Sequence, residues 1–253
     1  MARVKSYLRL QGSMGESTFL KEGTGPNYRA QDKLVVSPER FKTDPAFARV
    51  RENASEFGRG GKATKLIRVS VSTLLDGMKD KTLGRRLLAR IMQVIKSDNI
   101  SPRGQDNLID GNTLILKGFL FNSNATLSSV FALPIGTSIH RVTGQLIINV
   151  PAFTPGIQLK GPAAATHFQV QSAASEIDFE QGTFKTDYQH SAQLPYDGTA
   201  NPGITLTNTV TANSTQPLFL AFAIKFFQVS GTTMYPIMIG DKNVSMILDV
   251  NKV

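Results

Sequence analysis

Residues 217–227 read PLFLAFAIKFF, an almost unbroken apolar run. A strand that is covered on both faces shows this pattern, because the side chains of both faces must then be apolar. We therefore expect this run to form a central strand of a sheet. Nearby, ITLTNTVTA at residues 204–212 alternates: Ile204, Leu206 and Val210 share one face with Asn208, and threonines occupy the other.

Strand-like segments recur through the C-terminal part of the chain, and Pro and Gly residues separate them. They lie at residues 112–122, 140–151, 166–171, 175–181, 183–189, 203–213, 217–230 and 243–250. Short strands at such intervals are typical of two packed antiparallel sheets. We expect residues 105–253 to form an antiparallel β-sandwich domain, jelly-roll-like in type.

The N-terminal residues 1–40 predict a small β-meander. SYLRLQ (6–11), STFLKE (17–22) and DKLVVS (32–37) are partly alternating, and the turn-forming GSMG and GTGPN lie between them. Two or three such strands bury little surface by themselves. This segment must therefore lie on another part of the chain or on a neighbouring subunit.

Residues 41–99 have helical periodicity and predict an antiparallel helical unit. Asp44 followed by Pro45 indicates a capped helix start. An apolar stripe for the core follows at Phe47, Val50, Ala54 and Phe57, and Gly58–Gly61 are expected to end or break the helix. A second pattern covers residues 66–78, and a third covers 83–95, with Asp80 or Thr82 as its cap. The fold class predicted is therefore α+β, with a basic N-terminal part (1–104) before the sandwich (105–253).

Charge is unevenly spread along the chain. Residues 1–104 hold 21 of the 28 Lys and Arg and 10 of the 19 Asp and Glu, a net charge of +11 against −2 for the remainder. Such asymmetry suggests that the basic half meets an acidic partner. The residues we expect to make intersubunit or polyanion contacts are Arg49, Arg51, Arg59, Lys62, Lys65, Arg68, Arg85, Arg86 and Arg90. The alternative is a solvated or protein-contacting face, since acidic residues are interspersed and aromatic stacking platforms are lacking.

The segment SEIDFEQ (175–181) carries alternating carboxylates. As a strand, it would place Glu176, Asp178 and Glu180 on one face at intervals of about 6.6 Å. This row is a candidate acidic counter-surface for Arg and Lys side chains of another subunit. The alternative is the wet face of a half-exposed sheet.

No motif points to catalysis, and we expect no enzyme activity, no cofactor and no metal. The run EFGRGGKATK departs from a phosphate-binding loop, because Ala63 follows Lys62 where Ser or Thr is required. The chain has no Cys, so thiolate sites and disulfides are excluded. His140, His167 and His190 lie in or beside strand patterns without a nearby nucleophile motif.

The N-terminal residues include no apolar run of the kind found in a signal peptide, and no stretch is long and apolar enough for a membrane span. We expect a cytoplasmic location or one within an assembled particle, without membrane insertion.

GSMGESTFLK (12–21), TDPAFARVRENASEFGRGGKATK (43–65) and the C-terminal QPLFLAFAIKFFQV with its following YPI resemble an uncharacterised family of bacterial proteins of about this length. The resemblance spans most of the chain. It implies a shared layout of three zones and transfers no activity, ligand or catalytic residue.

Together these features predict a structural, self-assembling subunit of a multi-copy particle, tube or phage-like shell, with other copies of the chain as partners. A nucleic-acid-binding protein that uses the basic helical region is one alternative, and a carbohydrate- or surface-binding β-sandwich module is another.

Overall fold

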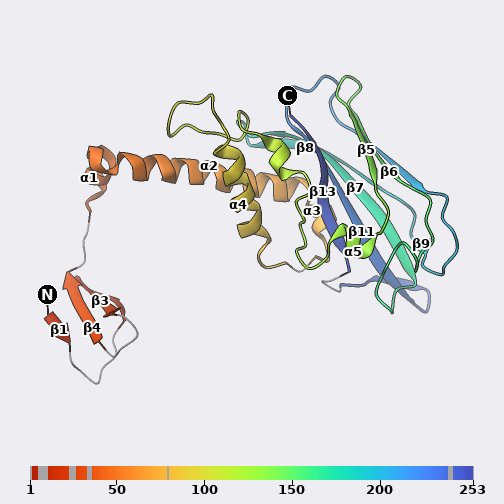
Figure 1. Cartoon of the computed structure of the whole chain (residues 1–253), viewed down its shortest axis with the longest axis horizontal. Coiled ribbons are helices and arrows are strands. Elements are labelled where there is room, and N and C mark those ends of the chain that lie inside the picture. The colour runs from red at the N-terminus through yellow and green to blue at the C-terminus, as the bar shows by residue number, and fades with distance from the viewer. Residues whose placement is uncertain are drawn as a thin grey trace. The chain divides into compact units, whose positions relative to one another are not determined.

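The computed structural model describes residues 2–4, 11–22, 27–32, 36–78, 80–238 and 242–252 (Figure 1). The fold class is α+β, as predicted: an N-terminal β-meander, the long helices α2 and α4, and antiparallel sheets, one of them curled into a half-barrel. The chain divides into two compact units, Met1–Arg51 and Glu52–Val253. The helices beyond α2 thus lie in the same unit as the larger sheets.

The first unit contains a four-stranded antiparallel sheet with the strand order β1-β4-β3-β2. Its strands are β1 (Ala2–Val4), β2 (Gly12–Met14), β3 (Ser17–Glu22) and β4 (Asn27–Asp32). The strand predicted at residues 17–22 is confirmed as β3. The strands predicted at 6–11 and 32–37 fall largely outside the described residues.

Two short helical segments follow, α1 (Pro38–Thr43) and the 3₁₀ helix η1 (Pro45–Phe47). Asp44 is the N-cap of η1, where its Oδ1 accepts a hydrogen bond from the Ala46 backbone N–H at 2.9 Å. The predicted helix start at Asp44 and Pro45 is therefore confirmed.

Helix α2 (Ala48–Ser70) passes through the glycine cluster without a break, so the break predicted at Gly58–Gly61 is wrong. Gly60 is buried, and a Cβ atom placed there would lie 2.7 Å from Met92 Sδ and 3.2 Å from Leu88 Cδ1. The missing side chain lets α2 and α4 approach closely. Packing against α4, rather than a turn, explains why glycine stands at this position.

The stripe predicted to face the core is also wrong. Val50 is 50% exposed and Phe57 is 58% exposed. The buried residues of α2 are instead the small or polar Glu56, Gly60, Ala63, Thr64 and Ser70, together with the apolar Ile67. This face meets Met92 and Leu88 of α4 at Gly60, and Ser70 O accepts from Tyr188 Oη of the large sheet at 2.7 Å. These contacts, and not the more apolar stripe, decide which face is buried.

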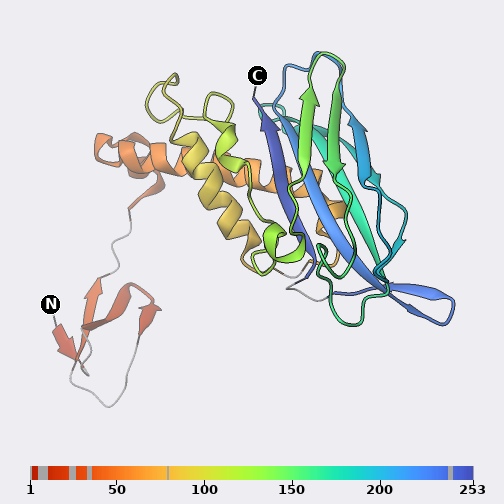
Figure 2. The ribbon, with the colours of Figure 1, turned by 45° about the vertical axis from the view of Figure 1, so that its right-hand side comes forward.

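The next helices are α3 (Ser72–Leu75) and α4 (Leu83–Ile95). The third predicted helix is confirmed as α4, whose N-cap is Thr82. The second predicted pattern, residues 66–78, is divided between the end of α2 and α3. Figures 1 and 2 show α2 and α4 crossing one another beside the large sheet.

The large six-stranded sheet is built around β11 (Leu218–Ser230), as the apolar run predicted. Strand β11 pairs with β7 along one edge and with β12 and β13 along the other, always antiparallel. The remaining strands are β7 (His167–Asp178), β8 (Thr183–His190), β9 (Leu194–Pro195), β12 (Thr233–Pro236) and β13 (Val244–Asn251). Strand β7 joins two segments, 166–171 and 175–181, that the sequence pattern had kept apart.

A second sheet has the order β10-β6-β5, with β5 (Gly136–His140), β6 (Gln145–Val150) and β10 (Ile204–Thr209). The strand predicted at 112–122 is wrong, because residues Thr113–Leu116 form the 3₁₀ helix η2. Leu116, Phe119 and Phe121 of this segment are still buried, whereas Leu114 is 51% exposed. The backbone N–H of Gly118 donates to Ile247 O of β13 at 2.8 Å. A short helix, α5 (Leu127–Val130), follows.

Strand β11 separates two cores. Leu218, Leu220, Phe222, Ile224 and Phe226 pack toward the β10-β6-β5 sheet. Phe219, Ala221 and Ala223 pack toward α2, α4 and the segment around η2. The large sheet therefore has helices on one face and the second sheet on the other, which accounts for the unbroken apolar run (Figure 2).

Polar contacts connect the two sheets where their edges meet. Asn208 of β10 is fully buried and donates from Nδ2 to Asp187 O of β8 at 2.8 Å, while its Oδ1 accepts from Ser172 Oγ of β7 at 2.6 Å. On the other side, Thr137 Oγ1 of β5 donates to Asp249 Oδ2 of β13 at 2.8 Å. Asn208 therefore lies on the inward face of β10, as the alternation predicted, and its amide is hydrogen-bonded there.

Candidate functional site

Among the nine predicted basic contact residues, Arg51, Arg59 and Arg86 donate from their guanidinium groups to backbone carbonyls, and Arg90 Nη1 donates to Gln93 Oε1 at 3.2 Å. Arg51 donates to Phe41 O at 2.6 Å and to Asp44 O at 3.0 Å. Arg59 donates to Asp106 O at 2.9 Å and to Gly104 O at 2.8 Å. Arg86 likewise binds two backbone carbonyls. We therefore assign Arg51, Arg59 and Arg86 a structural role, as donors of hydrogen bonds to backbone carbonyls.

The other six are exposed: Arg49, Lys62, Lys65, Arg68, Arg85 and Arg90. Lys62, Lys65 and Arg68 follow one another at three-residue intervals along α2, whereas Arg85 and Arg90 lie on α4. The exposed cations are therefore divided between two helices, and three of them form a ridge along α2.

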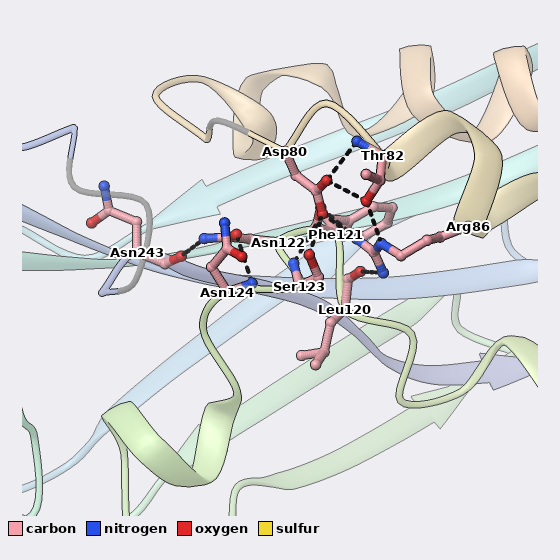
Figure 3. A network of polar contacts seen from close by, with 9 residues as sticks. All are labelled: Asp80, Thr82, Arg86, Leu120, Phe121, Asn122, Ser123, Asn124 and Asn243. Carbon is pink, nitrogen blue, oxygen red and sulfur yellow. Dashed lines mark hydrogen bonds and ion pairs between the residues drawn. The ribbon is translucent and has the colours of Figure 1, made fainter.

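Arg86 takes part in a polar network with Asp80 (Figure 3). Asp80 Oδ2 accepts from Arg86 Nη2 at 2.6 Å and from Ser123 N and Oγ at 3.0 and 2.8 Å. Its Oδ1 accepts from Thr82 N and Oγ1, both at 2.7 Å. Burial by itself raises the pKa of Asp80, but the hydrogen bonds from Thr82 and Ser123 outweigh it and hold the pKa far below its usual range.

The network joins segments that are distant in the sequence. Arg86 Nη1 donates to Leu120 O at 2.8 Å, and Asn122 Nδ2 donates to Asn243 O at 2.8 Å. Figure 3 shows these groups between the start of α4 and the segment that follows η2. The polar groups of the network form hydrogen bonds with one another, so we interpret the network as a set of contacts that holds α4 against the sheet.

A groove of about 730 Å³ lies beside the ridge of α2 and is the candidate binding site. Helix α2 contributes Ala63, Leu66 and Val69 to its lining, and α4 contributes Ile95. One wall is the segment 107–109, and the other comprises residues 179–182 and Phe184 at the β7–β8 turn. Lys62 and Lys65 line it as well, so the predicted basic surface and the groove overlap.

Side chains of the irregular loop itself hold the first wall in place. Asp98 Oδ1 accepts from Ile100 N and Ser101 N at 2.8 and 3.0 Å, and its Oδ2 accepts from Asn107 N at 3.0 Å. Asn107 Oδ1 in turn accepts from Ile109 N at 2.8 Å. Burial raises the pKa of Asp98, yet these hydrogen bonds outweigh it and keep the pKa far below its usual range. The wall is thus pre-formed in the folded chain.

The predicted acidic row contributes to the second wall. Asp178 Oδ1 accepts from Glu180 N and Gln181 N at 2.9 and 2.8 Å, which shapes the β7–β8 turn. Glu180 lies in this turn, beyond the end of β7, and lines the groove. Only Glu176 and Asp178 remain on one strand.

Glu176 is engaged within the chain. Its Oε1 accepts from Ser214 Oγ at 2.6 Å and its Oε2 from Thr211 N at 3.2 Å. Burial raises the pKa of Glu176, but the hydrogen bonds from Ser214 and Thr211 outweigh it and lower the pKa below its usual value. Of the three acidic residues, Glu180 is thus the one that faces the groove.

The histidines do not converge. His190 Nδ1 lies 3.2 Å from Gln169 Nε2, and His167 Nδ1 lies 3.1 Å from Thr166 Oγ1. Within the described residues, no three His, Asp or Glu side chains gather closely enough to hold a metal ion. Among the helices of the described ranges, none has the length and apolar character needed to cross a membrane.

Sequence reasoning missed most of the groove, because its walls come from segments about forty and more than a hundred residues beyond α2. A signal for the second wall was present in the sequence, because Phe179 and Phe184 lie on either side of the junction between the strands predicted at 175–181 and 183–189.

In comparisons with known proteins, no family, no curated protein sequence and no solved structure matches this chain. The resemblance to a bacterial family therefore stays a prediction.

Proposed function

We propose that this protein is a structural, self-assembling subunit of a multi-copy particle, tube or phage-like shell, with other copies of itself as partners. One observation carries the proposal. From residue 11 to residue 55, none of the side chains that the structure describes is buried, and Glu56 is the first that is. A small sheet whose described side chains are all at least partly exposed is marginal by itself, and burial against a neighbouring copy would supply a covering layer.

The exposed apolar side chains of the long helix support the same proposal. Phe57 is 58% exposed and Val50 is 50% exposed, on a helix whose other face is already packed. Fully burying such a side chain contributes roughly 1.5–3 kcal/mol. A contact in which the N-terminal segment of one copy covers the next is heterologous, and it builds rings or filaments.

The proposed assembly is tested by the mass of the full chain as a function of concentration, measured by sedimentation equilibrium. We expect the average mass to rise above that of one chain, and the variant Phe57→Asp to shift dissociation toward higher concentration. Because Phe57 is exposed, this variant is expected to keep the thermal unfolding temperature of the parent within about 2 °C. A parent chain that stays monomeric at every concentration would contradict the proposal.

Nucleic-acid binding is a second candidate, which the ridge of Lys62, Lys65 and Arg68 favours. Phosphate contacts by such residues predict an affinity that falls steeply with salt. Filter binding of single- and double-stranded DNA and RNA at low ionic strength tests this candidate, and no retention at any salt concentration would contradict it.

We further infer that the protein is located in the cytoplasm or within the assembled particle, and that it is not an enzyme. The carboxylates of Asp80, Asp98 and Glu176 support the second part of this inference, because hydrogen bonds within the chain engage each of them.

A further inference from the structure

The groove beside α2 has features that self-assembly through the N-terminal segment does not use. Its volume of about 730 Å³ lies within the range of small-molecule sites, roughly 300–1,000 Å³. Its lining is mainly apolar, and the apolar side chains include Leu66, Val69 and Phe184. Val69 is 45% exposed and Phe184 is 40% exposed, so the chain itself leaves this lining accessible.

The groove is pre-formed rather than a chance gap between mobile segments. Arg59 of α2 fixes the loop that carries the first wall through its bonds to Gly104 O and Asp106 O. Asp98 and Asp178 shape the two walls through backbone N–H groups. A site whose walls are held before binding loses less conformational freedom when a ligand arrives.

The charged residues that line the groove favour a ligand with a negatively charged group. Lys62 and Lys65 line it, and in the part of the chain that the structure describes neither forms a hydrogen bond or an ion pair. Arg59 also lines the groove, with its guanidinium bonded to Asp106 O and Gly104 O, and Glu180 contributes one negative charge from the opposite wall. Two free ammonium groups beside an apolar lining complement a molecule with an apolar body and an anionic end.

We propose that this groove binds a single-chain carboxylate of the fatty-acid class. The hydrocarbon chain lies along Leu66, Val69 and Phe184, and the carboxylate lies at Lys62 and Lys65. A polynucleotide is less suited to this place, because most of the lining offers no partner for phosphates. The proposal is independent of self-assembly, since Phe57 lies outside the groove.

The test uses fluorescence of dansyl-undecanoate added to the full chain, both as the parent and as Phe57→Asp. We expect saturable binding in both, displaced by tetradecanoate more strongly than by dodecanoate or decanoate. Each added methylene should strengthen binding by about twofold to fourfold while the groove is being filled. Failure of self-assembly with intact binding would overturn the proposed function only, and assembly without saturable binding would overturn the groove proposal only.

Variants locate the site and test the role of charge. The double variant Lys62→Ala with Lys65→Ala should weaken tetradecanoate binding by about five- to tenfold and leave tetradecanol binding unchanged. Arg85→Ala with Arg90→Ala removes equal charge from α4 away from the groove and should change neither. Glu180→Gln should tighten carboxylate binding by roughly twofold, because it removes a like charge.

Val69→Asp places a charge on the apolar lining and should abolish binding of both ligands. Since Val69 is 45% exposed, the fold is expected to persist, as circular dichroism would show. Phe184→Ser provides a second change on the opposite wall, with the same expected direction. Unchanged binding in both variants, or equal loss in the two double variants, would overturn the proposal.

Discussion

Alanine substitutions at the three glycines near the middle of α2 distinguish a continuous packed helix from a flexible joint. A Cβ atom at Gly58 or Gly61 would meet no atom within 4 Å. At Gly60 it would lie 2.7 Å from Met92 Sδ and 3.2 Å from Leu88 Cδ1. The three positions therefore share a helical backbone and differ in the space around them.

The magnitudes follow from this geometry. In a helix interior alanine is more stable than glycine by roughly 0.5–1 kcal/mol, so Gly58→Ala and Gly61→Ala should each stabilise the protein by about that amount. Gly60→Ala gains the same stabilisation from the helical preference of alanine, but it forces Met92 and Leu88 aside. Such overpacking costs about 1–3 kcal/mol. Gly60→Leu, which inserts four heavy atoms, should destabilise the protein by about 3 kcal/mol or more.

The assay is urea unfolding followed by far-ultraviolet circular dichroism, with thermal melts as a second measurement. For a unit of this size, 1 kcal/mol corresponds to a shift of about 2–4 °C in Tm. We expect Tm to rise in Gly61→Ala and to fall in Gly60→Leu. A loss of stability in Gly58→Ala and Gly61→Ala as large as that in Gly60→Leu would refute the reasoning, because it would mean that the glycines serve as a joint.

Three further predictions concern the polar contacts. Asp80→Asn should lower the free energy of unfolding by about 3 kcal/mol, because it leaves Arg86 without its carboxylate; urea unfolding measures this change. The pKa of Asp80 is lowered in the folded state, so the stability that its ionised carboxylate contributes is fully present when the pH is above the ordinary pKa of 3.8. This contribution is lost as the pH falls below 3.8. The parent should therefore lose more stability than Asp80→Asn when the pH is lowered from about 5 to about 2. Asn208→Ala should cost roughly 2 kcal/mol, because the carbonyl of Asp187 and the hydroxyl of Ser172 lose their buried partner, and thermal unfolding against the exposed control Thr207→Ala tests this.

The sheets were largely predictable because their pattern has one dominant cause. Strand β11 is covered on both faces, so burial largely sets its composition, and the almost unbroken apolar run at 217–227 identified it. Lys225 within the run is buried and donates from Nζ to Thr73 O at 2.8 Å. Strand β10 alternates because its outward face is exposed, which leaves Thr205, Thr207 and Thr209 in solvent. In both strands the local pattern and the tertiary environment agree.

The helical region was less predictable because tertiary contacts override local preference there. Glycine in a helix is locally unfavourable, and only the neighbouring Met92 and Leu88 show why Gly60 is retained. The stripe containing Phe57 satisfies the periodicity of a core-facing helix, yet it is the exposed one. The segment 112–122 buries Leu116, Phe119 and Phe121 as a strand would, and nothing in its composition shows that it contains a 3₁₀ helix.

The candidate site was predicted only in part. Lys62 and Lys65 were singled out from charge, and the structure places both on the groove. Arg59 and Arg86 were grouped with them, although their guanidinium groups bind carbonyls of loops far along the chain. Sequence periodicity shows which face of a helix a residue occupies, but it does not show which loop will lie against that face.

The central claim is that copies of this chain assemble with one another. Sedimentation equilibrium of the purified full chain, over a wide range of concentration and at low and physiological salt, tests it most directly. We predict an average mass that rises with concentration to several times that of one chain, with regular particles or filaments in negative-stain micrographs of the same samples. A mass equal to one chain at the highest concentration and at both salt levels would contradict it.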